Sequence, residues 1–183
     1  MHFSNNWFNN SELKNMIHLY LDKNKPNKIL EIGCFEGQSS CFFSNEYLQH
    51  PESKLICVDP FDVSDITTDL RSNTKQLFYN NIGETSGIHK IKVHEEYSTY
   101  FFPRNKEKYN FIYIDGSHLE QDVAYDFISS IYSCEEGGII WLDDYVYNPK
   151  VSSIIDKVYD IYSNHLEKLH CGWQAGFRKT LKI

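Results

Sequence analysis

Short apolar runs alternate with amphipathic segments along most of the chain. Nearly continuous apolar character predicts four buried strands, over residues 28–33, 54–58, 111–114 and 138–142. A fifth strand is predicted over residues 88–93, where apolar and basic side chains alternate as they do when one face of a strand is covered. The tail, residues 166–183, predicts two more strands that turn near Ala175 and Gly176.

Apolar residues recur at helical spacing in the segments between these strands. They predict helices over residues 11–21, 38–48, 68–81, 118–132 and 151–163. Such alternation is typical of parallel strands joined by crossover helices that cover both faces of a sheet. We therefore expect an α/β fold, a Rossmann-like seven-stranded, mostly parallel sheet with helices on both faces and a C-terminal antiparallel hairpin. One domain is expected over residues 1–183, with a helical extension (1–25) before the core (26–183).

The first predicted helix has apolar side chains that the core strands do not require. These are Leu13, Met16, Ile17 and Tyr20. We expect them to cover either the functional site or a partner subunit, and exposed apolar residues there would suit a homodimer.

Composition and charge exclude several classes of protein. The 183 residues carry a net charge of −7 at pH 7, whereas a nucleic-acid-binding protein needs a concentrated basic face. No segment approaches the roughly 20 apolar residues of a membrane span, and residues 1–10 do not resemble a signal peptide. The five cysteines include no close pair, which indicates reduced, mostly buried thiols. We expect a cytoplasmic protein without nucleic-acid or membrane partners.

A glycine-containing turn follows the first predicted strand. Gly33 and Gly37 leave room for a ligand, and the next helix presents its N-terminal amides to an anion. The second strand ends at Asp59, about 20 residues after Gly37, where a carboxylate can accept both hydroxyls of a ribose. The alternative for Asp59 is a turn former before Pro60. Taken together, the turn and the carboxylate favour an adenosyl ligand.

Carboxylates follow two further strands of the predicted sheet. Asp115 ends one strand, and Asp143 and Asp144 end the next. Clustered carboxylates repel one another unless they are protonated or bind a cation, and oxygen ligands suit Mg²⁺, Ca²⁺ or Mn²⁺. The alternative is that these residues cap turns and face water. His118, three residues after Asp115, is a candidate general base, with a solvated or capping histidine as its alternative.

Three stretches of sequence together resemble a known family. They are residues 31–39 (EIGCFEGQS), residues 112–118 (IYIDGSH) with Val123 and Asp126 after them, and residues 137–145 (GGIIWLDDY). The chain resembles class I S-adenosylmethionine-dependent methyltransferases, most closely the methyltransferase-24-type branch, with a fainter similarity to macrocin and catechol O-methyltransferases. The tail from Gly172 to Lys179 is similar to the closing hairpin of that branch.

The resemblance implies roles for individual residues. It implies that the first stretch holds the methionine part of the cofactor through Glu31, Gly33, Cys34, Gly37 and Ser39. It also implies ribose binding by Asp59, a place near the adenine for Glu96 and Ser98, a cofactor contact of Asp115, and a metal on Asp115, Asp143 and Asp144. His118 lies where the catechol-type enzymes place a lysine. The chain departs from the branch at Glu96-Tyr97-Ser98 and at Ser117, where an aromatic residue stacks on adenine in the catechol-type enzymes.

The predicted activity is methyl transfer from S-adenosylmethionine to a hydroxyl of a small molecule. A sugar, a polyol and a phenol all remain possible acceptors, with His118 and Asp115 as catalytic residues and a divalent ion, Mg²⁺, Mn²⁺ or Ca²⁺, as a possible aid. Tyr145 and Tyr147 either wall the acceptor pocket or pack on the sheet edge. One alternative is an oxidoreductase that uses NAD or a nucleotide sugar, although the first loop lacks the Gly-x-Gly-x-x-Gly spacing. Another is a non-catalytic partner subunit that binds an adenosyl ligand.

Overall fold

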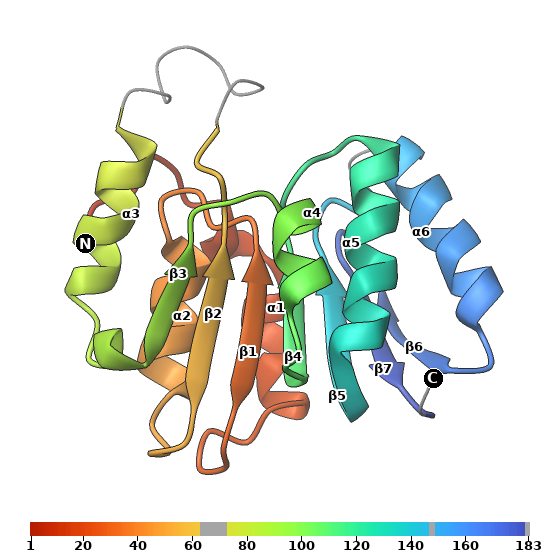
Figure 1. Ribbon diagram of the computed structural model, residues 1–183, viewed down its shortest axis with the longest axis horizontal. Helices are drawn as coiled ribbons and strands as arrows, with labels where there is room; N and C mark the ends of the chain where they lie inside the picture. Colours follow the sequence, from red (N-terminus) through yellow and green to blue (C-terminus); the bar gives the residue numbers. More distant parts are fainter. Residues whose placement is uncertain (63–72, 147–148, 182–183) are drawn as a thin grey trace.

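The fold is a three-layered α/β sandwich built on one seven-stranded sheet (Figure 1). A computed structural model describes residues 1–62, 73–146 and 149–181. The strands are β1 (Lys28–Ile32), β2 (Lys54–Val58), β3 (Ile91–His94), β4 (Tyr109–Ile114), β5 (Cys134–Leu142), β6 (Leu166–Cys171) and β7 (Ala175–Lys179). The helices are α1 (Glu12–Met16), α2 (Gln38–Tyr47), α3 (Thr74–Gly83), α4 (Ser98–Phe101), α5 (Glu120–Ser133) and α6 (Pro149–Tyr162).

The strand order is β3-β2-β1-β4-β5-β7-β6, and the first five strands of this order are parallel. Chain direction reverses at β7, which pairs antiparallel with both β5 and β6. This confirms the predicted Rossmann-like sheet with its closing hairpin. The order changes direction between β1 and β4, and in open α/β sheets such a switch point is where ligands bind.

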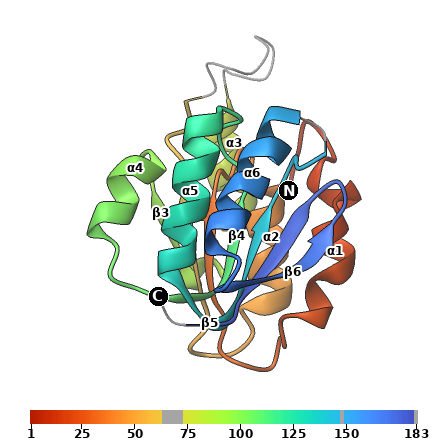
Figure 2. The same cartoon turned by 90° about the vertical axis from the view of Figure 1, so that its right-hand side faces the viewer.

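Helices cover both faces of the sheet (Figure 2), and an apolar layer on each face holds them in place. On one face, α1, α2 and α3 pack through residues such as Leu13, Phe43 and Phe78. On the other, α4, α5 and α6 pack through residues such as Phe101, Phe127 and Ile155. The central strands contribute side chains to both layers, which explains their unbroken apolar sequences.

The structure corrects two details of the predicted elements and leaves a third partly outside the described residues. Residues 88–90 form a 3-10 turn, so β3 is shorter than its alternating sequence indicates. The predicted helix over 68–81 is described only from Thr74, because residues 63–72 lie outside the described part of the chain. The tail turns at residues 172–174, and Ala175 and Gly176 already belong to β7.

The first helix packs against the chain's own sheet. Leu13 and Ile17 are fully buried in the core layer that also contains Trp141. The prediction that these apolar residues cover the site or a partner is therefore wrong for Leu13 and Ile17, because their apolar surface is buried within the chain itself. The homodimer stays a prediction without that support. Within the described residues, no helix combines the length and apolarity needed to cross a bilayer.

Candidate functional site

Four residues that end neighbouring parallel strands lie on one edge of the sheet. The backbone amide of each donates to the carbonyl of the last residue of the adjoining strand. These hydrogen bonds join Gly33 to Val58 at 2.9 Å, Asp59 to His94 at 3.1 Å, Asp115 to Ile32 at 2.8 Å, and Asp143 to Ile114 at 2.9 Å. The hydrogen-bond ladder thus runs one step beyond the strands. It brings the glycine turn and the acidic strand ends to one level, at the switch point between β1 and β4.

Gly33 is required by a close approach of two loops. Its φ is +83°, and a β-carbon there would lie 2.0 Å from the carbonyl oxygen of Asp115. Gly37, with φ of +81°, begins α2, and a β-carbon there would lie 2.9 Å from the ring of Phe78. Both glycines are therefore fixed by packing as well as by backbone conformation.

Left-handed backbone at residues other than glycine is concentrated at the same edge. Among the described residues it occurs at Phe35, Phe61 and Asp144, with φ of 49°, 54° and 56°. Each lies within two residues of Gly33, Asp59 or Asp143. Strained backbone persists where the surroundings hold it, and it is common at functional sites.

Asp59 organises the glycine turn. One carboxylate oxygen accepts the amides of Cys34 at 2.6 Å and Phe35 at 3.0 Å, and the other accepts the amide of Phe61 at 2.6 Å. Burial raises the pKa of Asp59, and these three amide donors oppose that rise. Asp59 thus joins the end of β2 to the turn after β1, and its predicted contact with a ribose stays a prediction.

Glu31 lies beneath the same turn and is fully buried. Its carboxylate accepts hydrogen bonds from the hydroxyls of Ser39 and of Ser40, the latter at 2.5 Å, and from the thiol of Cys57 at 3.6 Å. Burial raises the pKa of Glu31 to about 7. Glu31 and Ser39 bond to each other, and Cys34 is also buried, so their predicted contacts with a cofactor stay predictions.

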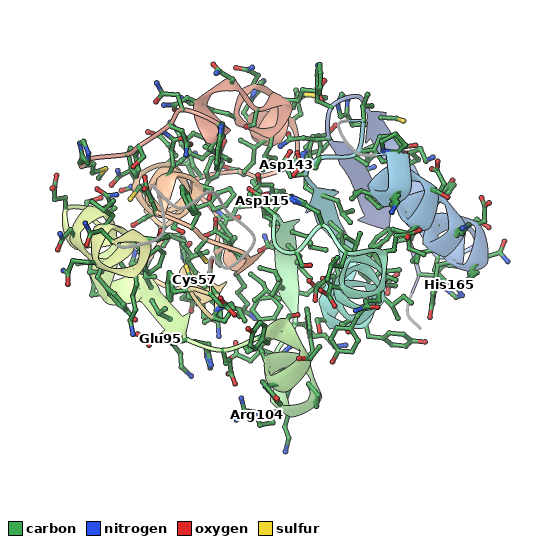
Figure 3. All side chains as sticks on the ribbon, turned by 90° about the horizontal axis from the view of Figure 1, so that it is seen from above. Cys57, Glu95, Arg104, Asp115, Asp143 and His165 are labelled. Atoms are coloured by element: carbon green, nitrogen blue, oxygen red, sulfur yellow. The ribbon has the colours of Figure 1, made fainter. Side chains whose placement is uncertain are left out.

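Asp115 and Asp143, which directly follow β4 and β5, lie close to each other (Figure 3), and a tyrosine of β4 contacts both. The hydroxyl of buried Tyr113 donates to Asp143 at 2.6 Å and lies 3.3 Å from an Asp115 oxygen. The second oxygen of Asp143 accepts the amide of Asp144 at 2.8 Å. Each oxygen of Asp143 therefore already has a protein donor.

His118 joins the acidic residues through Asp144. It lies in the loop before α5, and its Nε2 is 2.5 Å from an Asp144 oxygen. One donor atom each from Asp115, His118 and Asp144 lies within 4.8 Å of the other two. Asp143 is turned to Tyr113 and its own loop, so His118 lies closer than Asp143 to the other two carboxylates. The predicted ligand set Asp115, Asp143 and Asp144 stays a prediction.

The electrostatics of the cluster favour a proton or a cation. Crowding by protein atoms, and then the charges of Asp143 and Asp144, raise the pKa of Asp115 well above its ordinary value, although Asp115 itself is exposed at the surface. Burial also raises the pKa of Asp143. Carboxylates this close cannot all carry a charge cheaply, so the cluster can hold a proton or a positive ion between them.

Glu96 and Ser98 lie beyond β3, at one side of this edge. Glu96 bonds to Arg104 and lies 3.2 Å from the ring nitrogen of His94, while Ser98 begins α4. Their predicted place beside adenine stays a prediction. Ser98 also bonds to Asp126, a buried residue of α5 whose pKa burial raises to about 7.

Asp126 was not among the predicted site residues. One of its carboxylate oxygens is buried without a protein partner, and the other would lie 3.8 Å from a β-carbon at Gly116. Asp126 thus sits between the loop after β4 and the start of α4. The sequence indicated Asp126 only through its place after residues 112–118 in the stretch that resembles the family. A single acidic residue on a helix face is usually solvated, so helical spacing alone did not point to it.

The N-terminal segment, residues 1–8, crosses the glycine turn, and the sequence offered no signal for this. The amide and hydroxyl of Ser4 each donate to buried Glu36 at 2.7 Å, and the ring of Trp7 lies 5.4 Å from that of Phe35. Phe8 packs edge-on against Tyr113 at 6.0 Å. The segment therefore contacts both the turn and the tyrosine of the acidic cluster.

Tyr145 packs on the sheet rather than walling a pocket. It is buried, and its hydroxyl lies 3.0 Å from both oxygens of Asp156. Tyr147 lies outside the described residues. A hollow of about 700 Å³, lined by residues such as Lys54, His89 and Lys92, contains none of the predicted site residues.

The chain matches a known protein family and is similar in fold to solved structures. The model of the Methyltransf_24 family, described as a methyltransferase domain, matches residues 30–145, more than half of the chain. No curated protein matches the sequence.

Three solved structures are similar in fold. The O-methyltransferase TomG of Streptomyces achromogenes, involved in tomaymycin synthesis and bound to S-adenosylmethionine, has 14% identity and a TM-score of 0.69, with 91% of this chain and 78% of that chain covered. An O-methyltransferase of Bacillus cereus in complex with S-adenosylhomocysteine has 15% identity and a TM-score of 0.66, with 92% and 82% covered. A putative rRNA-methylase of Clostridium thermocellum has 7% identity and a TM-score of 0.74, with 100% of both chains covered.

Proposed function

The chain belongs to the methyltransferase-domain family that matches residues 30–145, and on this premise we propose that it transfers a methyl group from S-adenosylmethionine to a hydroxyl oxygen of a small molecule. The observation that carries the proposal is the continued ladder at the sheet edge, which brings Gly33, Asp59, Asp115 and Asp143 together. A donor bound along the turn and an acceptor bound at the acidic cluster would then be neighbours, and proximity supplies much of such a reaction.

The glycine turn lies at the switch point of the sheet, where ligands bind in open α/β folds. Gly33 and Gly37 let this turn pack closely against the Asp115 carbonyl and Phe78. We propose that this turn holds the methionine part and that Asp59 faces the ribose. When bound, S-adenosylmethionine supplies an activated methyl group on a positively charged sulfur, which suits the acidic surroundings.

His118 is the proposed general base. Its Nε2 is paired with Asp144, which orients the ring, so the other ring nitrogen, Nδ1, would take the proton. The acceptor oxygen would lose its proton to His118 and bond to the methyl carbon as the carbon–sulfur bond of the donor breaks, with the electron pair of that bond left on sulfur. Asp115 lies beside this pair and can hold the acceptor hydroxyl in place.

A divalent ion on Asp115, His118 and Asp144 is a second candidate for the same cluster. The donor set of two carboxylates and an imidazole suits Mn²⁺ better than Ca²⁺ or Mg²⁺, which prefer oxygen ligands alone. Such an ion would lower the pKa of an acceptor hydroxyl. An ion would take the place of the contact between His118 Nε2 and Asp144, and a chelator would remove it, so a chelator separates the two candidates. Loss of activity with a chelator supports the ion, and unchanged activity supports His118 as the base.

Ligand-induced stabilisation tests the proposal without a known acceptor. S-adenosylhomocysteine at about 100 times its dissociation constant is expected to stabilise the fold by about 2.7 kcal/mol, measured as a rise in Tm. NAD is expected to leave Tm unchanged, which separates the proposal from an oxidoreductase. A rise in Tm with NAD alone would overturn it.

Turnover then tests the catalytic roles. With an accepted substrate, His118→Ala is expected to lower kcat by about 100-fold, as loss of a general base does. A non-catalytic partner subunit would form no S-adenosylhomocysteine from any acceptor. An RNA acceptor, which the rRNA-methylase neighbour raises, is disfavoured by the net charge of −7. We place the activity in the cytoplasm, a proposal supported by the five free cysteines.

A further inference from the structure

A carboxylate and two thiols meet in the apolar layer beneath the glycine turn. Glu31, Cys34 and Cys57 are all buried, and one oxygen or sulfur atom of each lies within 4.8 Å of those of the other two. We call these three residues the thiol cluster. Figure 3 shows Cys57 well apart from Asp115 and Asp143, so the thiol cluster is separate from the acidic cluster.

The parallel pairing of β1 with β2 brings two members of the thiol cluster together. Glu31 pairs with Cys57 in the strand register, so the two side chains lie on the same face of the sheet. A Glu31 oxygen is 3.6 Å from the Cys57 sulfur. Cys34 adds its thiol from the turn after β1, where its backbone amide donates to Asp59 at 2.6 Å. The ladder between the two strands and the Asp59 bond therefore fix the positions from which all three side chains start.

The spacing within the thiol cluster agrees with the ligand spacing around a tetrahedral zinc ion. Zinc binds thiolate sulfur at about 2.3 Å and carboxylate oxygen at about 2.0–2.2 Å, so a sulfur and an oxygen on the same ion lie about 3.5 Å apart. The Glu31 oxygen and the Cys57 sulfur are separated by 3.6 Å without any ion. These two ligands thus already have the separation that zinc requires.

Two hydroxyls hold the Glu31 carboxylate in place. Ser39 donates to one of its oxygens, and Ser40 donates to the other at 2.5 Å. Donors of this kind orient a carboxylate ligand toward its ion. The Ser40 oxygen also lies 3.8 Å from the Cys57 sulfur, close enough to complete a set of four ligands.

The mixture of sulfur and oxygen donors selects the kind of cation. Thiolates favour Zn²⁺ and Cu⁺ over Mg²⁺ and Ca²⁺, and the carboxylate favours Zn²⁺ over Cu⁺. Two thiolates and a carboxylate carry three negative charges into an apolar layer. A divalent ion offsets two of these charges, which a neutral or anionic ligand would not do.

We propose that Glu31, Cys34 and Cys57 form a zinc-binding site that joins the glycine turn to β1 and β2. Both thiols lose their protons to solvent when zinc binds. The ion supports the turn from below, and the site does not depend on the proposed methyl transfer.

Cobalt is a spectroscopic probe for this site. Co²⁺ bound by thiolate absorbs strongly in the near ultraviolet, whereas Co²⁺ bound by Asp115, His118 and Asp144 has no sulfur ligand and lacks that band. The protein is freed of metal with a chelator and titrated with Co²⁺. We expect the thiolate band to appear, and to disappear when Zn²⁺ displaces the cobalt.

Single substitutions identify the ligands. Cys34→Ser and Cys57→Ser are each expected to halve the thiolate band at saturation and to weaken zinc binding about 100-fold, because a hydroxyl is a weaker ligand than a thiolate. Two controls are expected to change neither quantity: Cys41→Ser, in the same apolar layer, and Cys171→Ser, at an exposed thiol. Thermal unfolding of the metal-free variants verifies that each one is folded.

A measurement on the unaltered protein keeps the test independent of any substitution. X-ray absorption at the zinc edge, with one equivalent of Zn²⁺, is expected to show two sulfur neighbours at about 2.3 Å. Absence of sulfur neighbours, unchanged affinity in Cys57→Ser, or equal losses in Cys57→Ser and Cys41→Ser would overturn the site. A disulfide between Cys34 and Cys57 in the purified chain would also overturn it and would identify a redox pair instead.

Discussion

At the scale of single residues, the clustered carboxylates and the left-handed backbone angles lie together where the parallel strands end. Gly33, Asp59 and Asp115 each combine a backbone bond that extends the sheet with a second contact to a neighbouring loop. Buried Glu31 supports the same turn from below through Ser39 and Ser40. Changes at these positions should therefore alter the site and the stability of the fold together.

Gly33→Ala is expected to lower the free energy of unfolding by about 4 kcal/mol, because it adds both a left-handed backbone penalty and a collision with the Asp115 carbonyl. Urea unfolding measures the loss. Gly137→Ala is a matched control, since Gly137 also has a positive φ of +79° but no atom lies within 4 Å of a β-carbon there. The control should cost about 1 kcal/mol, and equal losses in both variants would contradict the packing argument.

The free energy of unfolding should fall as pH rises, because Glu31 loses its proton. Its pKa is about 7 in the folded chain against 4.5 as the ordinary value, so the folded state binds the proton more tightly. The stabilisation is complete below pH 4.5 and is lost progressively between about pH 4.5 and 7, to a total of about 3 kcal/mol.

Glu31→Gln keeps a polar group for Ser39 and Ser40 but cannot ionise. We expect a smaller fall in the free energy of unfolding between pH 5 and 7.5 in this variant than in the unaltered protein, measured by urea unfolding at both values. Exposed Glu52→Gln is the control and should follow the unaltered protein. The same pH slope in Glu31→Gln and the control would show that other groups govern the effect.

At the scale of elements, segments remote in sequence brace the functional edge. Residues 1–8 lie over the glycine turn, and α1 holds the β6–β7 turn through Glu12. Neither contact follows from helical or strand periodicity. The N-terminal part of the chain thus acts as a support for the site, although its own helix has only five residues.

Residues 1–8 are held by two hydrogen bonds from Ser4 to Glu36, and the free energy of unfolding should fall further when both are removed than when one is removed. Glu36→Ala removes the acceptor for both the amide and the hydroxyl of Ser4, with an expected loss of about 3 kcal/mol in the free energy of unfolding. Ser4→Ala removes only the hydroxyl bond and should cost about 1 kcal/mol. Urea unfolding and amide hydrogen exchange at Ser4 measure the two effects. Equal small losses would mean that the segment is held by other contacts.

At the scale of the whole molecule, two apolar layers enclose the sheet and with it most of the thiols. Cys34, Cys41, Cys57 and Cys134 are buried, and Cys171 is exposed. Burial raises the pKa of Cys41 and of Cys134 to about 12, which makes both thiols unreactive near neutral pH.

Thiol labelling therefore reports the integrity of both layers. We expect a disulfide reagent such as Ellman's reagent to modify one thiol per folded chain, Cys171, and all five after denaturation. Cys171→Ser should reduce the rapid labelling of the folded chain to nothing. Rapid reaction of two or more thiols in the native protein would contradict the described burial.

The sequence alone was sufficient for the order and type of most elements. Apolar runs such as those of β4 and β5 have to be covered on both faces, and in alternation with helices they specify a parallel α/β sheet. The sequence also placed Gly33, Asp59, Asp115 and Asp143 at strand ends, because turn residues and carboxylates interrupt apolar patterns there. These conclusions depend on local patterns that can be read along the chain.

Tertiary structure alone decided which of these side chains face one another. That Asp143 bonds to Tyr113 while His118 joins Asp144 depends on loop conformations, including the left-handed backbone of Asp144. The contact of Ser4 with Glu36 depends on how a segment without periodicity packs across the sheet edge. Local sequence patterns determine whether a segment forms a helix or a strand. Contacts between distant loops come from the packing of the whole chain, and no local pattern encodes them.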